Sequence, residues 1–147
     1  MNFVASRASA IENLNKFVDR NLFEYSKLRN FDFGPENRSN ISCLSPYISH
    51  GILNEQEVIV KSLNKFSFSK NEKFIQEVLW RTYWKGWLEL RPNVWTDYLS
   101  ELKEIHNKYK ENTDYKNAIE GNTNIECFNK WVNELKKNNY LHNHARM

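Results

Sequence analysis

Two charged side chains lie four residues apart in the most aromatic segment of the chain. Glu77 and Arg81 share one stripe of a predicted helix over residues 69–90, and Trp80 and Trp84 flank that stripe. Indole faces beside a carboxylate and a guanidinium form a platform for a flat ligand with polar edges, such as a nucleobase or a flavin ring. The alternative is an aromatic core helix in which Glu77 and Arg81 form one ion pair.

A second candidate site lies at residues 39–47, which read SNISCLSPY. Ser42 and Ser45 straddle the predicted start of a short helix, where Pro46 suits the first helical position. Hydroxyls and unbonded backbone N–H groups at a helix N-terminus favour an anion such as a pyrophosphate. The segment has no glycine-rich fingerprint and no Walker lysine, so Ser45 acting only as the cap of its own helix is the alternative.

The chain ends in LHNHARM, a third group of polar side chains. Asn143 and Arg146 are three residues apart on one helical face, so they could reach a ligand together or pair with each other. His142 and His144 are separated by one residue and would point about 160° apart on a helix. They cannot hold one metal ion from a single helix, and no Cys or acidic partner lies close by, so we expect no metal site.

The composition limits the classes of protein to which these sites can belong. The 147 residues include 27% charged and 40% hydrophobic residues, with a formal net charge of +3. Four glycines and three prolines are too few for a turn-rich β-sandwich or barrel. The small positive charge permits a phosphate-bearing partner without requiring one. Two distant cysteines and the lack of a secretory signal or a long apolar run favour a cytoplasmic protein with no membrane span.

The hydrophobic periodicity is helical along nearly the whole chain. Helices are expected over about residues 6–27, 45–51, 54–66, 69–90 and 94–112, with shorter ones after residues 114, 123 and 140. Capping boxes are expected for the pairs Asn54 and Glu57, Ser69 and Glu72, and Thr123 and Glu126. No segment alternates convincingly as a strand would, so the predicted fold class is all-α, a multi-helix bundle.

Two of these helices carry apolar residues that are expected to face the interior. The aromatic helix ending near residue 90 carries apolar residues most of the way around and should be buried on several sides. The helix over 94–112 should face inward with five residues: Trp95, Tyr98, Leu102, Ile105 and Tyr109.

Four blocks, taken in order, resemble the FAD-binding helical domain of the photolyase/cryptochrome family. They read YSKLRN at 25–30, ISCLSPY at 41–47, EVLWRTY at 77–83 and LHNHARM at 141–147. The resemblance covers about Ser6 to Met147 and is closest to bacterial members that carry this domain without an N-terminal antenna domain. It implies that residues 1–147 are the N-terminal part of the domain, with the C-terminal part missing and this fragment alone inactive.

The resemblance implies FAD as the cofactor, DNA as the partner and a role for each matching residue. The flavin contacts would be Tyr25, Ser42, Cys43, Leu44, Ser45, Phe74, Asn143 and Arg146. The catalytic pair that receives a flipped pyrimidine dimer would be Glu77 and Trp80. The other residues of the DNA-facing cleft would be Arg29, Arg81, Trp84, Asn143 and His144.

Three positions depart from the family pattern. Ile41 replaces a usual Thr or Ser and removes one hydroxyl near the phosphates. Cys43 replaces a usual Arg or Lys, and His144 replaces an Arg that many members carry, which could weaken a DNA contact. The acidic partner that the family pairs with the arginine at position 146 is also absent from the chain.

The resemblance leaves three functions open. The first is a photolyase-like lyase, in which reduced FAD absorbs blue light and donates one electron to a pyrimidine dimer that Glu77 hydrogen-bonds and Trp80 stacks against. The second is a cryptochrome-like photoreceptor or flavoprotein without repair activity. The third is a fragment that binds nothing stably, because half a pocket cannot bury most of a ligand.

Overall fold

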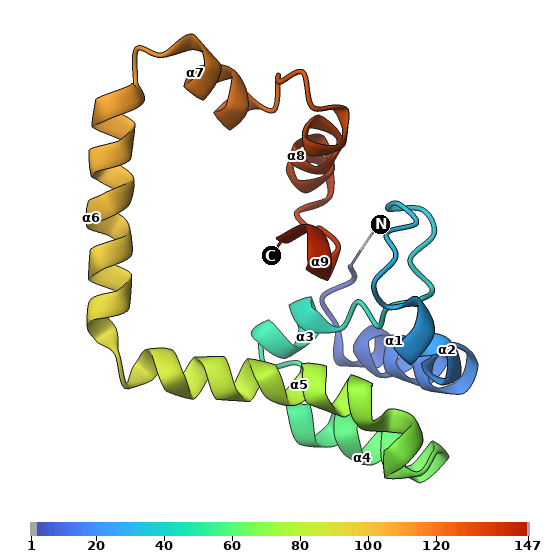
Figure 1. The fold of residues 1–147 in the computed structure, drawn as a ribbon. Coiled ribbons are helices and arrows are strands. Elements are labelled where there is room, and N and C mark those ends of the chain that lie inside the picture. Colours follow the sequence, from blue (N-terminus) through green and yellow to red (C-terminus); the bar gives the residue numbers. More distant parts are fainter. Residues whose placement is uncertain (1–2, 147) are drawn as a thin grey trace. The chain divides into compact units, whose positions relative to one another are not determined.

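The computed structural model describes residues 3–146, and these residues contain nine α-helices and no strand. This confirms the predicted all-α class. The helices are α1 (Arg7–Arg20), α2 (Leu22–Leu28), α3 (Ser45–Ser49), α4 (Glu55–Lys65), α5 (Phe68–Glu89), α6 (Pro92–Tyr109), α7 (Thr113–Glu120), α8 (Glu126–Asn138) and α9 (Asn143–Arg146) (Figure 1). The chain divides into two compact units, Met1–Trp84 and Lys85–Met147.

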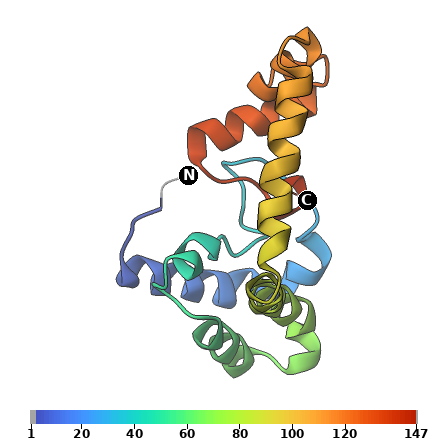
Figure 2. The same cartoon turned by 90° about the vertical axis from the view of Figure 1, so that its left-hand side faces the viewer.

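The first unit is a bundle of α1–α4 and most of α5 around one apolar core. Figure 2 looks nearly along α5 and shows α1, α3 and α4 grouped at one side of that helix. Burial of apolar area from these helices supplies the main driving force for folding. The core residues are Ala10, Leu14, Phe17, Val18, Leu22, Tyr25, Leu44, Tyr47, Leu53, Val58, Phe74 and Val78.

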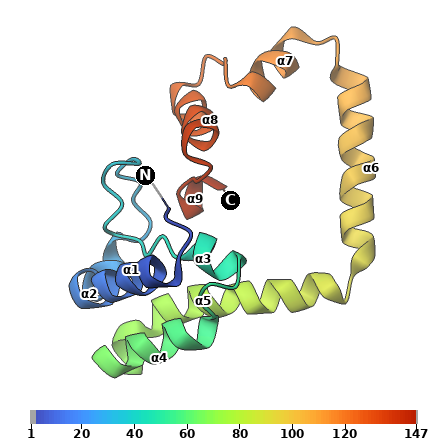
Figure 3. The same cartoon turned by 180° about the vertical axis from the view of Figure 1, so that it is seen from behind.

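Local capping and one buried amide fix the helices that frame this core. The Asn54 side chain accepts the N–H of Glu57 while the Glu57 carboxylate accepts the N–H of Asn54, which confirms the predicted capping box of α4. The Asn71 amide of α5 donates to the carbonyl oxygens of Ser62 at 2.9 Å and of Phe66 at 2.8 Å. Asn71 is almost fully buried, and it joins the end of α4 to α5, which run side by side (Figures 1 and 3).

Three predicted helix boundaries are wrong. The expected helix over 6–27 is divided at Asn21, whose side-chain amide donates to the carbonyl of Ser39 at 2.5 Å instead of facing solvent from a continuous helix. Ser69 lies inside α5, which begins at Phe68, so it cannot cap that helix. The hydroxyl of Thr123 accepts the N–H of Ile125 and bonds Asn129, so it does not form the expected box with Glu126.

The second unit contains the end of α5 and helices α6 to α9. Along α6, which stands apart from α8 in Figures 1 and 3, no residue is buried. The expectation of an inward face is therefore wrong within the described residues, since all five of its members are exposed: Trp95, Tyr98, Leu102, Ile105 and Tyr109. The apolar periodicity of α6 predicts a face that could pack against an apolar neighbour. It does not indicate whether residues 3–146 contain that neighbour.

Gly121 ends α7 in the left-handed conformation, with φ of +77°. A Cβ added there would lie 2.6 Å from Cγ1 of Val132 on α8. We expect Gly121→Ala to destabilise the second unit by about 2–4 kcal/mol, because left-handed strain adds to overpacking. Chemical unfolding followed by circular dichroism measures the change.

Two further variants separate the causes of that loss. Gly121→Ala with Val132→Ala should recover the part due to the clash, because the contacting methyl groups are gone. Gly34→Ala has a similar φ of +84° and no atom within 4 Å of the added Cβ, so it should show the strain alone. Equal losses for Gly121→Ala and Gly34→Ala would contradict the close approach of α7 and α8.

Candidate functional site

The outer face of α5 carries three adjacent aromatic side chains. Trp80, Tyr83 and Trp84 lie side by side because positions three and four apart on a helix share one face. Their side chains are 51%, 55% and 49% exposed. The Trp80 and Trp84 rings are stacked, with centroids 6.3 Å apart and an interplanar angle of 25°. Tyr83 meets both rings edge-on, at 5.4 Å and 5.5 Å. The expectation that this part of the helix is buried on several sides is wrong, and the result is an exposed aromatic platform.

The charged stripe beside this platform pairs with other elements of the first unit. Oε1 of Glu77 accepts a hydrogen bond from Nη1 of Arg29 at 2.5 Å, and both side chains are partly buried. Arg81 donates to Oγ of Ser49 at 2.6 Å and lies 3.8 Å from a carboxylate oxygen of Glu55. The alternative of a Glu77–Arg81 pair is wrong, because the bundle brings a closer partner to each residue. Glu77 and Arg81 thus lie one turn apart beside Trp80 and Trp84 on α5, and Arg29 contacts Glu77 from the end of α2.

Two predicted flavin contacts belong to the apolar core. Tyr25 and Phe74 are buried and meet edge to face, with centroids 5.3 Å apart. Phe17 contacts both rings, at 5.8 Å and 5.1 Å. Packing of this kind holds α2 and α5 together beneath the Arg29–Glu77 pair.

Burial raises the pKa of the Tyr25 hydroxyl well above its ordinary value, and the nearby charge of Glu77 raises it further. In the unfolded chain a tyrosine ionises near pH 10, whereas Tyr25 stays protonated in the folded state. Stability should therefore be retained below pH 10 and fall by about 1.4 kcal/mol per pH unit above it, relative to Tyr25→Phe. Urea unfolding of both proteins between pH 9 and pH 11.5 measures this, and parallel curves would contradict the burial of the hydroxyl.

The loop that precedes α3 borders a pocket. The buried amide of Asn40 donates to the carbonyl oxygens of Leu28 and Phe31, both at 2.8 Å, and fastens the loop to the end of α2. Ser42 and Cys43 lie on the pocket wall, and Cys43 has a left-handed backbone, with φ of +51°. The pocket has a volume of about 520 Å³ and is lined by Phe3, Asn13, Lys16, Phe17, Arg20, Asn21, Pro35, Glu36, Arg38, Ser39, Ile41, Ser42 and Cys43.

The other two residues predicted at this loop have different surroundings. Leu44 is buried in the core and occupies the N-cap position of α3. Ser45 is the first residue of that helix, and the structure has no side-chain cap there, so the alternative of Ser45 as the cap is wrong. Neither residue lines the pocket.

The predicted C-terminal residues lie in the second unit. Arg146 donates to Oδ1 of Asn143 at 3.3 Å, and its guanidinium lies 5.7 Å from the ring centroid of Tyr140. His142 is buried and precedes α9, so the helical estimate of opposed histidines is wrong. Its ring lies 5.7 Å from that of His144, whose backbone N–H donates to Nδ1 of His142. Met147, the last residue of this motif, lies outside the described residues.

The predicted site residues thus fall into separate groups. The first unit holds Glu77, Trp80, Arg81 and Trp84 on α5 with Arg29 against Glu77, and it holds Ser42 and Cys43 at the pocket. The second unit holds Asn143, His144 and Arg146. Among the described residues no group of three or more His, Cys, Asp or Glu could hold a metal ion, and none of the helices could cross a membrane.

Sequence reasoning missed several residues of these sites. Ser49 and Glu55 hold Arg81, and Tyr83 completes the aromatic platform. The sequence could have indicated Tyr83, because it lies three residues after Trp80 and residues three apart share one face of a helix. Lys16 and Arg20, four residues apart on α1, carried a second such signal for a basic pocket wall.

Comparison with known proteins adds a distant relative. The chain is 20% identical over 143 residues to a deoxyribodipyrimidine photo-lyase of Vibrio cholerae serotype O1. The chain is distantly similar to a photolyase. The match covers 91% of this chain but only 29% of the length of the relative. No family model matches the chain, and no solved structure matches it. The all-helical fold is consistent with the helical domain of a photolyase.

Proposed function

We propose that the chain is part of a photolyase-like flavoprotein and that the outer face of α5 receives a flipped pyrimidine dimer. The exposed platform of Trp80, Tyr83 and Trp84 beside the Glu77 carboxylate is the observation that carries this proposal. Bases taken out of a stack are bound by aromatic faces together with hydrogen bonds to their polar edges. The distant photolyase relative supports the same assignment.

Glu77 and Trp80 would act on the dimer in different ways. Arg29 occupies Oε1 of Glu77, and Oε2 accepts no hydrogen bond from the described residues. Oε2 can therefore accept a hydrogen bond from a pyrimidine N–H, while Arg29 fixes the direction of the carboxylate. Trp80 offers an exposed indole face for stacking, worth roughly 1–3 kcal/mol per base.

Arg29 and Arg81 would bind the DNA backbone through guanidinium N–H groups that do not contact their carboxylate partners. Both arginines are already oriented by carboxylates, Arg29 by Glu77 and Arg81 by Glu55. Ordered guanidinium groups lose less conformational entropy when they bind a phosphate. Trp84 extends the platform along α5 toward a neighbouring base, and Asn143 and His144 are proposed as further DNA contacts from the second unit.

FAD is the proposed cofactor. The residues of the loop pocket suit its phosphates, whereas two of the residues predicted to contact FAD, Tyr25 and Phe74, are buried in the core. Ser42 and Cys43 line a pocket with three cationic side chains, which suits a diphosphate. Tyr25 and Phe74 are core residues, so they support the site from below. Reduced FAD, when bound, supplies one electron to the dimer after absorbing blue light.

We further propose that residues 1–147 hold only the N-terminal part of the flavin-binding domain. The chain spans 29% of the length of its photolyase relative. Asn143 and Arg146, the remaining proposed flavin contacts, bond each other. The chain by itself should therefore bind FAD weakly, and a purified yellow protein with a tightly held flavin would contradict this proposal.

The test of the proposed activity is illumination of a dimer-containing oligonucleotide with a longer protein that carries this chain and reduced FAD. Recovery of intact pyrimidines under blue light, with none in the dark, is the expected result. Glu77→Ala should lower the rate, because the dimer loses its hydrogen-bond acceptor. Intact dimers in the presence of bound, reduced flavin would instead favour the second candidate, a cryptochrome-like photoreceptor.

A further inference from the structure

The exposed face of α6 has the repeat of a coiled-coil helix. Its apolar residues recur at alternating spacings of three and four, which are the a and d positions of a heptad. These seam residues are Trp95, Tyr98, Leu102, Ile105 and Tyr109. The side of the helix away from the seam is polar at every position: Thr96, Asp97, Ser100, Lys103, Glu104 and Asn107. A seam of this kind is suited to pack against a second helix with the same repeat.

The described residues of the second unit leave this seam uncovered. Every residue of α6 is exposed, and the seam residues are between 39% and 62% exposed. Tyr115 of α7 meets the end of the seam, with its ring centroid 6.0 Å from that of Tyr109, yet Tyr109 is still 39% exposed. A row of exposed aromatic and aliphatic side chains along one helix marks an interaction site.

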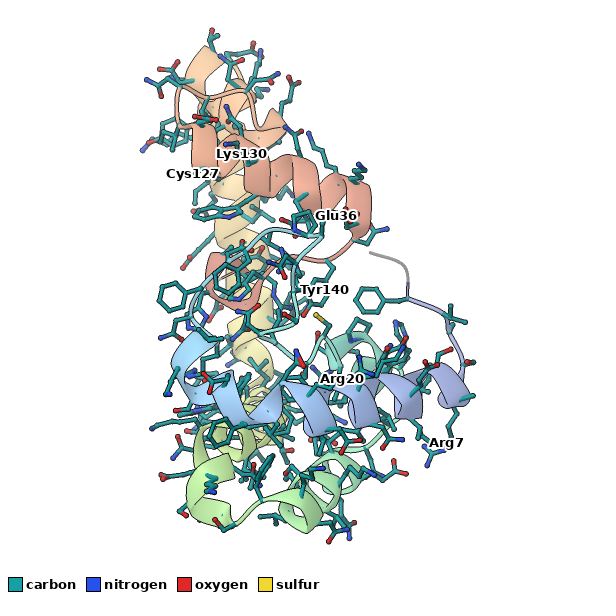
Figure 4. All side chains as sticks on the ribbon, turned by 90° about the vertical axis from the view of Figure 1, so that its right-hand side faces the viewer. Arg7, Arg20, Glu36, Cys127, Lys130 and Tyr140 are labelled. Atoms are coloured by element: carbon teal, nitrogen blue, oxygen red, sulfur yellow. The ribbon has the colours of Figure 1, made fainter. Side chains whose placement is uncertain are left out.

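The charges beside the seam match a second copy of α6 that runs in the opposite direction. Glu101 at the middle of α6 and Lys108 near its end are both g positions, next to the seam. Neither forms an ion pair within the part of the chain that the structure describes. By contrast, Lys130, labelled on α8 in Figure 4, pairs with Glu126 one turn earlier at 2.7 Å. In an antiparallel helix pair g positions face g positions, so Glu101 of each copy would meet Lys108 of the other.

We propose that two copies of the chain associate through α6, with the two helices antiparallel and residues 98–109 of each copy in contact. The register that brings Glu101 to Lys108 also places Tyr98 opposite Tyr109 and Leu102 opposite Ile105. Two-fold symmetry makes each of these contacts twice. The partial charges at the helix ends favour the same direction, because the N-terminus of one helix lies beside the C-terminus of the other. A parallel pair would lose the match of Glu101 with Lys108 and would bring like helix ends together.

The length of the overlap sets the strength of this association. Residues 98–109 extend about 18 Å along the helix axis, and Trp95 lies beyond the overlap. An interface of that length falls at the small end of specific protein interfaces, which is typical of transient complexes. The dimer should therefore form at high protein concentration and dissociate on dilution. None of its residues belongs to the proposed flavin or DNA sites, so this proposal is independent of the proposed function.

The test is sedimentation velocity of the 147-residue chain from micromolar to millimolar concentration. The wild type should shift from monomer to dimer as its concentration rises. Glu101→Lys should weaken the dimer by about tenfold, because two attractive pairs become two repulsive ones. The matched control is Glu89→Lys, which makes the same change of net charge at an exposed position of α5 outside the seam and should change the dissociation constant less than about twofold.

Two further variants test the direction of the helices and the seam itself. Glu101→Lys with Lys108→Glu should recover the wild-type affinity, since the same pairs form with their signs exchanged. Leu102→Gln should abolish the dimer, whereas Leu90→Gln, at an exposed leucine outside the seam, should leave it intact. A monomer at every concentration would overturn the proposal and show that another surface covers α6. A dimer that survives Leu102→Gln, an equal loss in Glu89→Lys, or no recovery in the double variant would overturn it as well.

Discussion

Trp80→Ala should weaken binding of dimer-containing DNA by roughly 5- to 150-fold. Stacking of one base on an aromatic side chain contributes about 1–3 kcal/mol, and about 1.4 kcal/mol corresponds to a tenfold change in affinity. Trp80 is half exposed and stacks on Trp84 with centroids 6.3 Å apart, so the substitution removes one of the three rings of the platform. The backbone should be unaffected, because alanine suits a helix. Fluorescence anisotropy with a labelled oligonucleotide measures the dissociation constant.

The matched control is Trp95→Ala. Trp95 is also an exposed tryptophan on a helix, at 62% exposure, and it stacks on Tyr98 with centroids 5.5 Å apart. It is no part of the proposed site, so its replacement should leave the DNA affinity within about twofold. Equal losses for the two variants would mean that exposed indoles bind DNA without regard to position. An unchanged affinity for Trp80→Ala would remove its proposed role.

Asn71→Asp should lower the free energy of unfolding of the first unit by about 3–5 kcal/mol, the usual cost of an uncompensated buried charge. Two N–H groups of Asn71 donate to the carbonyl oxygens of Ser62 and Phe66. Aspartate has the same shape, but it would place a carboxylate oxygen against these two carbonyl oxygens. A loss of this size is a large share of the roughly 5–15 kcal/mol that stabilises a natural domain. Urea unfolding followed by circular dichroism at pH 7 measures it.

Asn37→Asp supplies the matched control for this change. Asn37 is an exposed residue of the loop in the same unit, so its replacement makes the same chemical change in water. Its effect should stay within about 0.5 kcal/mol. The deficit of Asn71→Asp should also shrink at acid pH, where the new carboxyl is protonated and can donate to one carbonyl. A loss no larger than that of Asn37→Asp would contradict the buried bridge between α4 and α5.

The helices were predictable because each depends on residues that are close in sequence. The spacing of apolar residues identified every long helix, and Asn54 with Glu57 placed the start of α4 correctly. Boundaries failed where distant groups decide them. Asn21 ends α1 with a side chain that donates to Ser39, eighteen residues away, and no local pattern contains that bond.

The residue types of the candidate site could be predicted from the sequence, but the ion-pair and hydrogen-bond partners of Glu77 and Arg81 could not. The expected i, i+4 pair of Glu77 and Arg81 assumes that the helix is alone. In the bundle Arg29, at the end of α2, donates to Glu77, and Arg81 donates to the hydroxyl of Ser49 on α3. Periodicity likewise indicates an apolar face, as at Trp95, without stating what covers it.

The central claim, that the outer face of α5 receives a flipped pyrimidine dimer, is tested most directly by two dissociation constants. They are measured for one oligonucleotide with and without a single pyrimidine dimer. A damaged site costs less to unstack, so the dimer-containing strand should bind more tightly to the wild type, and Trp80→Ala should abolish most of that difference. Equal affinities of the wild type for both strands would contradict the claim.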